Sequence, residues 1–256
     1  MSHEISPDRF DTVTKNVSGS NARTPGGIQR LNVGQRAPYA WLDTEPRPLH
    51  LLSRFMAPKY KLSYFDMRAR GEPTRMLFAA AGIEFEDDRI SFDKWPSVKG
   101  TTPMGQLPVL EVDGVKLCQS MPIARFVAKE TGMAGKTNLE QAQADAFVDE
   151  IIPVLPTLYN VALGSEEEKK AALAKGFDKT METTLARCEK LCGSSGFLVG
   201  NSLLWCDLVL HTVATNIENY KPGTMKNYPK LTKVMDSVNA NPKIAAWIAK
   251  RPDTSF

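Results

Sequence analysis

The stretch "YKLSYFDMRARGEPTR", residues 60–75, decides how the rest of the chain is interpreted. Polar and apolar residues alternate at its start, the period of a half-buried strand that shares one face among Tyr60, Leu62 and Tyr64. A glycine and a proline then mark a turn, and the apolar run "TRMLFAAAG" predicts a helix over 73–81. The phenol of Tyr64 therefore stands at the tip of a strand, directly before an arginine-lined turn. A tyrosine in such a position can also simply cap a core.

Strands and helices alternate from residue 59 to about residue 132. A second strand is predicted over 84–90, and "LPVLEV" and "VKLCQS" predict two short strands joined by a hairpin turn at Asp113-Gly114. A further helix is predicted from Ser120 in "SMPIARFVAKETG". The order βαβ followed by ββα is typical of a small α/β layer.

The pattern of strands vanishes after Asn138, and the remaining sequence predicts an all-helical bundle. A capping box at 165–168 opens one long helix whose core face carries Leu173, Phe177, Met181, Leu185, Cys188 and Cys192. The segment "LLWCDLVLHTVATNIE" is apolar on most sides, which predicts a buried helix. A last helix begins at Asn241 and Pro242 and stops before Pro252.

Residues 1–55 have a different composition, rich in Ser, Asn, Gly, Pro and charge, which is typical of a disordered segment. They lack the apolar stretch of a secretory signal, and their acidic residues argue against a mitochondrial presequence. Met56 opens the ordered part. We therefore predict a disordered N-terminal extension over 1–55, an α/β domain over 56–134 and an all-helical domain over 137–256.

The whole chain has 256 residues, 42% of them apolar, which is enough for two ordinary domains. Its net charge of +3 is spread without a basic face, and no apolar run approaches membrane-spanning length. The four cysteines lie among apolar neighbours without nearby histidines, so buried thiols are favoured over zinc ligands or disulfides. We therefore expect a cytoplasmic protein whose partners include neither nucleic acid nor a membrane.

Three further stretches carry candidate binding residues. "FDKWPSVKG" places Trp95 and Lys99 four apart in a polar loop. "GQLPVL" places Pro108 at the start of a strand, which suits an edge strand or a cis bond. "CQSMPIAR" sets Gln119 and Ser120 at a helix N-terminus, where free N–H groups and the helix dipole favour an anion. Each has a purely structural alternative, as a turn, an N-cap or a packing residue.

Taken together, in this order and spacing, these stretches resemble the cytosolic glutathione transferases, and most closely the sigma class, which includes haematopoietic prostaglandin D synthase. The resemblance covers residues 57–256. It implies a thioredoxin-like first domain, an all-helical second domain and a homodimer. It also implies an enzyme that joins glutathione, as co-substrate, to small hydrophobic electrophiles by alkyl or aryl transfer to sulfur. No metal and no permanently bound cofactor is implied.

The resemblance assigns a chemical role to the tyrosine at the strand tip. The thiol of free glutathione has a pKa of about 8.5, so little of it is ionised at neutral pH, and a hydroxyl donor aimed at the sulfur stabilises the thiolate. Tyr64 is implied to be that donor, with Arg70 as its electrostatic support. The resemblance implies that Trp95 and Lys99 bind the glycine carboxylate of glutathione. It implies that Gln106, Leu107 and Pro108 bind the peptide. Gln119 and Ser120 are implied to bind the γ-glutamyl end.

The pocket for the second substrate is less clearly marked. Position within the family places it among Phe65, Met67, Arg68, Tyr159 and Asn160. These residues could equally belong to an ordinary surface, and they do not identify the electrophile.

Three positions depart from the pattern of the family. Leu204 replaces a helix-capping threonine, which costs about 1 kcal/mol unless Ser202 or Asp207 compensates. Pro153 stands where many relatives have an aspartate that reaches the neighbouring subunit, and Asn160 stands where the prostaglandin pocket has a tryptophan. Two alternatives stay open: a glutathione-dependent prostaglandin D isomerase and an S-crystallin-like structural protein.

A group of carboxylates near the start of the helical half raises the question of a metal site. Asp145 and Asp149 lie four apart with Glu150 beside them, but Ile152 and Pro153 follow where further carboxylates would complete a cluster. We therefore expect these acids to be solvated or ion-paired, with no bound metal. The proline is expected to bend the helix.

Overall fold

A computed structural model describes residues 58–254, so the predicted extension 1–55 and Met56 lie outside it. Four strands form one sheet in the order β2-β1-β3-β4. Their bounds are β1 (Tyr60–Phe65), β2 (Glu86–Ile90), β3 (Val109–Val112) and β4 (Val115–Cys118). β1 is parallel to β2 and antiparallel to β3, and β3 and β4 form the predicted hairpin.

The local signals of the first half produce the predicted elements. Side chains along β1 alternate between buried and half-buried, as its polar pattern requires. α1 (Glu72–Ala81) has a proline in its first turn and ends at Gly82, whose φ of 72° is a left-handed cap. The hairpin turn has positive φ at both Asp113 and Gly114, 49° and 87°, which is the geometry that tight hairpins need.

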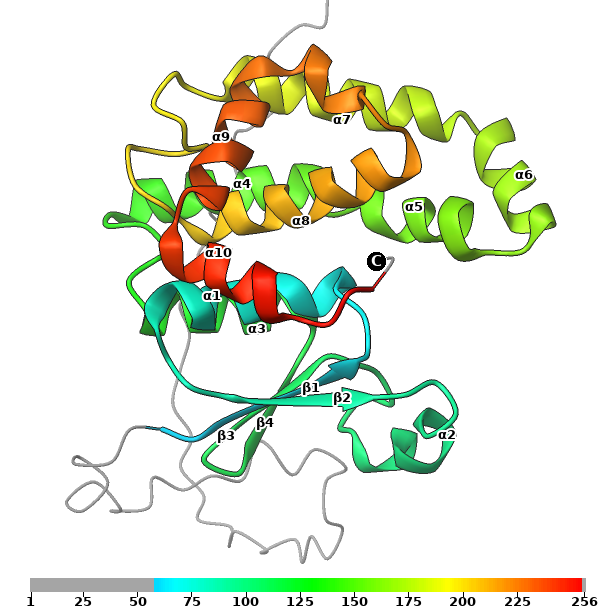
Figure 1. The fold of residues 1–256 in the computed structure, drawn as a ribbon, viewed down its shortest axis with the longest axis vertical. Coiled ribbons are helices and arrows are strands. Elements are labelled where there is room, and N and C mark those ends of the chain that lie inside the picture. The colour runs from blue at the N-terminus through cyan, green and yellow to red at the C-terminus, as the bar shows by residue number, and fades with distance from the viewer. Residues whose placement is uncertain (1–57, 255–256) are drawn as a thin grey trace, which may run out of the picture. The chain divides into compact units, whose positions relative to one another are not determined.

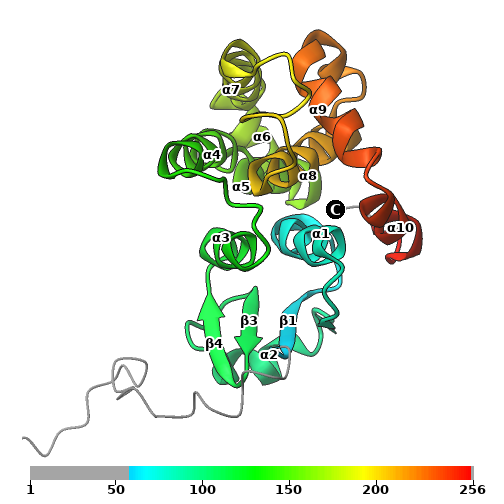
Figure 2. The same cartoon turned by 90° about the vertical axis from the view of Figure 1, so that its left-hand side faces the viewer.

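Two helices separate the sheet from the helical half. α1 and α3 (Ser120–Glu130) lie side by side between the sheet and the bundle (Figures 1 and 2). The short α2 (Trp95–Val98) lies near the ends of the strands that carry the predicted site (Figure 1). The arrangement is a thioredoxin-like mixed sheet joined to an all-helical domain, as predicted.

The second half contains helices and no strand in the part that the structure describes. Its elements are α4 (Asn138–Ile151), α5 (Val154–Leu163), α6 (Glu166–Ala174), α7 (Phe177–Leu191), α8 (Trp205–Tyr220), α9 (Pro229–Asn239) and α10 (Pro242–Lys250). α8 is the central helix, with 12 of its 16 residues buried, which confirms the prediction made from its apolar pattern. α10 leaves the bundle and packs beside α1 (Figures 1 and 2).

Two predictions about helices in this half need correction or refinement. The single long helix after the capping box is two helices, because Gly176 adopts a left-handed φ of 79° between α6 and α7. Leu173 belongs to α6 and is 40% exposed, so it is not part of the core face. The predicted bend at Pro153 is a break between α4 and α5.

The segment Asn138–Leu163, taken as one helix, is long enough to cross a membrane, and an 18-residue window within it has a mean hydropathy of 1.3. The expectation that no apolar run approaches that length was therefore wrong. Length and composition alone are weak support for a membrane span, because core helices of soluble proteins have the same properties. Here α4 and α5 both pack against α8.

Asp207, one of the two residues considered as a replacement for the missing threonine cap of α8, binds the segment that leads into the helix. Its carboxylate is fully buried and accepts the backbone N–H groups of Leu198 and Leu204, each at 2.8 Å. Burial raises the pKa of Asp207 to about 7, while the two N–H groups act in the opposite direction. Asp207 thus ties the chain before α8 to the first turn of the helix, and its own N–H donates to the carbonyl oxygen of Leu204 at 3.1 Å.

Candidate active site

The predicted glutathione-binding residues gather at one end of the sheet, because the strand register places them there. Ser63 pairs with Val109, and Val109 pairs with Cys118. The next residue at each of these strand ends is Tyr64, Pro108 or Gln119, so three segments far apart in sequence converge at one edge.

Tyr64 is the central side chain of this edge. Its ring is buried, with 5% exposure, and its hydroxyl oxygen accepts the backbone N–H of Arg70 at 3.3 Å. Burial raises the pKa of Tyr64, partly offset by the N–H of Arg70 and by the charges of Arg70 and Arg75. The phenol therefore stays protonated at neutral pH. Because the oxygen already accepts one N–H, its own proton is left to donate to a ligand.

The turn that follows β1 brings Arg70 back to Tyr64. Ala69–Gly71 form one turn of 3-10 helix, with a positive φ of 35° at Ala69. Gly71 lies against the phenol ring, and a Cβ built there would be 2.6 Å from a ring carbon of Tyr64. The glycine is what allows the backbone to approach the ring this closely.

Gln106 and Gln119, which the resemblance assigns to neighbouring parts of the glutathione site, contact each other. The amide of Gln119 donates to the side-chain oxygen of Gln106 at 3.3 Å. Gln119 precedes α3 with a φ of 72°, and Ser120, the first residue of α3, is buried. Between them in space, the Leu107–Pro108 bond is cis, which agrees with the expectation for a proline at this strand start. The side-chain amides of Gln106 and Gln119 and the N-terminus of α3 thus lie at the edge of the sheet that carries Tyr64, and they are a set of donors suited to a carboxylate and a peptide.

Trp95 and Lys99 lie on the short helical segment at the far side of β1. Trp95 is the first residue of α2, and its ring meets the ring of Phe65 edge-on, with centroids 5.5 Å apart. Lys99 begins the next turn and is exposed.

The five residues predicted for the second substrate divide into two groups. Tyr159 lies within electrostatic reach of Tyr64 and Arg70. Its pKa is raised, mainly because the hydroxyl is buried and to a smaller extent because Tyr64 is near. Arg68 lies near Arg251. Its pKa is lowered, mainly because the guanidinium is buried and to a smaller extent because of the positive charge of Arg251. Met67 lies on the turn between them, and Asn160 is exposed on α5.

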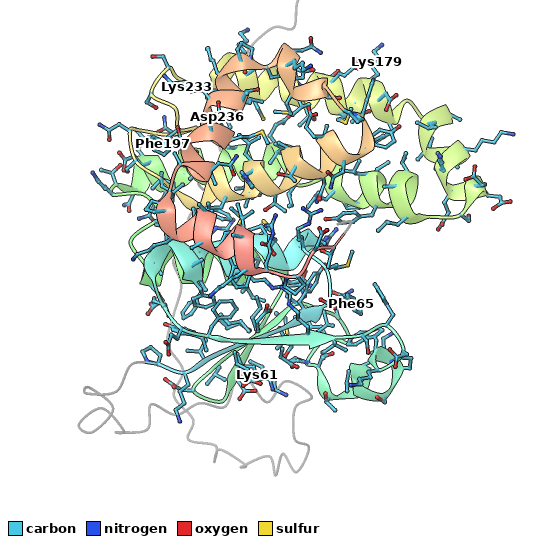
Figure 3. The ribbon with its side chains drawn as sticks, in the orientation of Figure 1. Lys61, Phe65, Lys179, Phe197, Lys233 and Asp236 are labelled. Atoms are coloured by element: carbon cyan, nitrogen blue, oxygen red, sulfur yellow. The ribbon has the colours of Figure 1, made fainter. Side chains whose placement is uncertain are left out.

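Phe65 belongs to a different surface, on the α2 side of β1 (Figure 3). Its ring stacks on Phe92, with centroids 4.7 Å apart and planes 20° from parallel. Phe92 is 66% exposed, and the sequence reading missed it because it stands in a loop without periodicity. Together with Trp95, these rings form an aromatic surface that continues from Tyr64, whose ring centroid is 5.7 Å from that of Phe65.

Two of the three carboxylates considered for a metal are engaged in ion pairs. Asp145 pairs with Arg125 at 2.9 Å, and Glu150 pairs with Arg187 at 3.1 Å. Over residues 58–254, no group of three or more His, Cys, Asp or Glu side chains is arranged to hold a metal ion. The cysteines in this range are free thiols, and burial raises the pKa of Cys188, Cys192 and Cys206.

Comparison with known proteins matches both halves of the chain. Residues 60–129 match the family "Glutathione S-transferase, N-terminal domain" and residues 138–251 match "Glutathione S-transferase, C-terminal domain". Hematopoietic prostaglandin D synthase of Gallus gallus is 41% identical over 199 residues, and glutathione S-transferase 1 of Ascaris suum is 38% identical over 205 residues. Both alignments cover 78% of this chain and all of the relative. The structure of rat hPGDS complexed with a quinoline superposes with a TM-score of 0.73 at 38% identity, covering 78% of this chain and all of the other.

Proposed function

The chain belongs to the glutathione S-transferase family, in its sigma, prostaglandin D synthase-like branch, and we propose that it activates the thiol of glutathione for attack on hydrophobic electrophiles. One observation carries this proposal. The hydroxyl of Tyr64 accepts the N–H of Arg70 and is held at the strand edge as a protonated donor, next to the groups suited to a peptide ligand.

The chemistry that we propose begins with the sulfur of glutathione placed against this hydroxyl. The Tyr64 hydroxyl donates a hydrogen bond to the sulfur and stabilises its thiolate more than its thiol, so the thiol loses its proton to solvent. Each unit by which the thiol pKa falls corresponds to about 1.4 kcal/mol, and a fall of two units makes most of the bound sulfur reactive at neutral pH. The thiolate then forms a carbon–sulfur bond with the electrophile, which loses its leaving group or takes up a proton.

In the same proposal, donor groups at the two ends of the site bind the two carboxylates of glutathione. Ser120 and Gln119, at the N-terminus of α3, receive the γ-glutamyl carboxylate, where free N–H groups and the helix dipole favour an anion. The backbone of Leu107 pairs with the peptide of glutathione like an added strand, beside Gln106. Trp95 and Lys99 hold the glycine carboxylate at the opposite end. Arg70 adds positive charge near the sulfur.

The remaining expectations are part of this proposal. Residues 56–134 form the glutathione-binding domain and residues 137–256 the helical domain of a cytoplasmic homodimer. The second substrate is a small hydrophobic electrophile bound between the turn after β1 and Tyr159, and a planar aromatic substrate extends past Tyr64 onto the surface formed by Phe65, Phe92 and Trp95. Isomerisation of a prostaglandin endoperoxide by glutathione is a second candidate activity, favoured by the relatives that carry the name prostaglandin D synthase.

Two measurements test the proposal and separate its alternatives. Retention of the protein on immobilised glutathione, eluted by free glutathione, tests binding. Turnover with an aryl halide and with a prostaglandin endoperoxide then compares conjugation with isomerisation. Binding without turnover of either would favour an S-crystallin-like structural protein, and a lack of retention would contradict the proposal.

A further inference from the structure

A connected set of buried charged side chains lies beneath the turn that follows Tyr64. At its centre is Arg75 of α1, which has no solvent exposure. Its guanidinium donates to the carboxylate of Asp87 at 2.8 Å and pairs with Glu72 at 3.4 Å. A buried cation is costly unless its donors are satisfied, so this arginine is tied to a fixed set of partners.

The same guanidinium also holds the backbone of the turn. It donates to the carbonyl oxygen of Met67 at 2.7 Å and to that of Phe65 at 3.5 Å. These two carbonyls belong to the first and third residues after Tyr64. The planar, forked guanidinium can satisfy carboxylates and carbonyls at once, which the single ammonium of a lysine cannot do.

Glu72 joins this set to the C-terminal helix. It is 1% exposed, and its second oxygen accepts the indole N–H of Trp247 at 2.8 Å and the guanidinium of Arg251 at 2.7 Å. Trp247 lies in α10, and Arg251 is the first residue after this helix. Both donors therefore come from a segment more than 170 residues further along the chain than Glu72. The backbone N–H of Glu72 also donates to the carbonyl of Arg68 at 3.0 Å, within the turn.

The turn is therefore fixed at both ends by buried residues of α1: Arg75 binds the carbonyls at its start and Glu72 follows its end. Between these anchors lies Arg70, whose N–H reaches the hydroxyl of Tyr64. An N–H that donates to a phenol oxygen polarises the hydroxyl and makes it a stronger donor to a third group, here the sulfur. A small shift of the turn would weaken that bond without touching any ligand.

We propose that Arg75 and Glu72 are positioning residues for thiol activation, and that Arg251 completes their support from the C-terminal segment. The proposal rests on the proposed function. It links the last helix of the chain to the chemistry of the strand edge, so that loosening α10 weakens the activation of the thiol while the groups that bind glutathione stay in place.

Arg251→Gln tests the proposal, because it removes one charged partner of Glu72 and leaves the indole of Trp247 bonded. We expect the pKa of enzyme-bound glutathione to rise by about half to one unit, with turnover at pH 6.5 lowered about two- to fivefold and the KM for glutathione changed less than twofold. Activity should approach that of the unmodified protein at high pH, where the thiol is ionised without help. Arg251→Lys keeps the positive charge beside Glu72, so it should keep most of the lowering of the thiol pKa.

Two further variants sharpen the experiment. Arg75→Lys keeps the charge but not the fork, so it should raise the thiol pKa more than Arg251→Gln does. If Arg75→Lys fails to fold, Arg251→Gln decides the question alone. Arg187→Gln removes an exposed ion pair with Glu150 in the helical half and serves as the matched control, with an unchanged thiol pKa.

The outcomes separate this inference from the proposed function. If the unmodified protein leaves the bound thiol at the pKa of free glutathione, the proposed function fails and this inference fails with it. If the unmodified protein lowers the thiol pKa and Arg251→Gln keeps that lowered value while losing thermal stability, the set of charges is structural only and the positioning role is overturned.

Discussion

Replacement of Asp207 by alanine should destabilise the fold by several kcal/mol without touching the site. The carboxylate is fully buried, and its two oxygens accept the N–H groups of Leu198 and Leu204 at 2.8 Å each. A buried N–H without a partner costs about 1–3 kcal/mol, so the alanine variant should lose about 2–6 kcal/mol. This is a large share of the roughly 5–15 kcal/mol that stabilise a typical domain.

Asp207→Asn is the informative companion, because an amide keeps one acceptor oxygen and should lose only about half as much. Its pH dependence has a defined sign. Burial raises the pKa of Asp207 to about 7, above its unfolded value of about 3.9, so the fold binds more protons than the unfolded chain between these values. Stability from this group is present at low pH and is lost as the pH rises through 7, so the gap between aspartate and asparagine should narrow with rising pH.

Denaturant unfolding followed by tryptophan fluorescence measures these differences. Asp178→Ala is the control, since that carboxylate is exposed on α7, bonds to Tyr220 and Lys221, and should matter by less than about 1 kcal/mol. If the free energy of unfolding of Asp207→Ala lies within about 1 kcal/mol of that of the unmodified protein, the argument that this carboxylate stabilises the fold through its two N–H partners is refuted.

Three other predictions concern function. Phe92→Ala should raise the KM for an aryl halide several-fold and leave that for a small aliphatic enal nearly unchanged, because an exposed ring stacked on Phe65 offers area to planar substrates; equal changes in both KM values would contradict this. Deletion of residues 1–55 should leave dimerisation and turnover intact by light scattering and kinetics, and a monomeric or inactive product would show that the extension matters. Millimolar Mg²⁺ should change neither glutathione affinity nor turnover, because Asp145 is paired with Arg125; activation that Asp149→Asn abolishes would contradict this.

The elements of the first half were predictable because their signals are local. The alternation in β1, the proline and glycine that bound α1, and the Asp113-Gly114 turn each depend on a few adjacent residues. The convergence of Tyr64, Gln106 and Gln119 was available from the family resemblance, since strand register is not encoded in any one segment.

The features that the sequence did not predict depend on contacts between residues far apart in the chain or on a single backbone angle. The periodic apolar residues across α6 and α7 fit one helix, and only the left-handed Gly176 divides them. The bonds from Trp247 and Arg251 to Glu72 join segments whose sequences carry no sign of one another. Phe92 was missed because an exposed aromatic residue in a loop has no pattern to mark it.

The thiol pKa of bound glutathione in a Tyr64→Phe variant tests the central claim most directly. The substitution keeps the ring that packs against Gly71 and removes only the hydroxyl. Titration of the thiolate absorbance in the unmodified protein should give a pKa about two units below the free value of roughly 8.5, and the variant should bind glutathione with a pKa near that free value. A variant that binds glutathione and still lowers the thiol pKa to the same extent would contradict the account and assign the activation to another group.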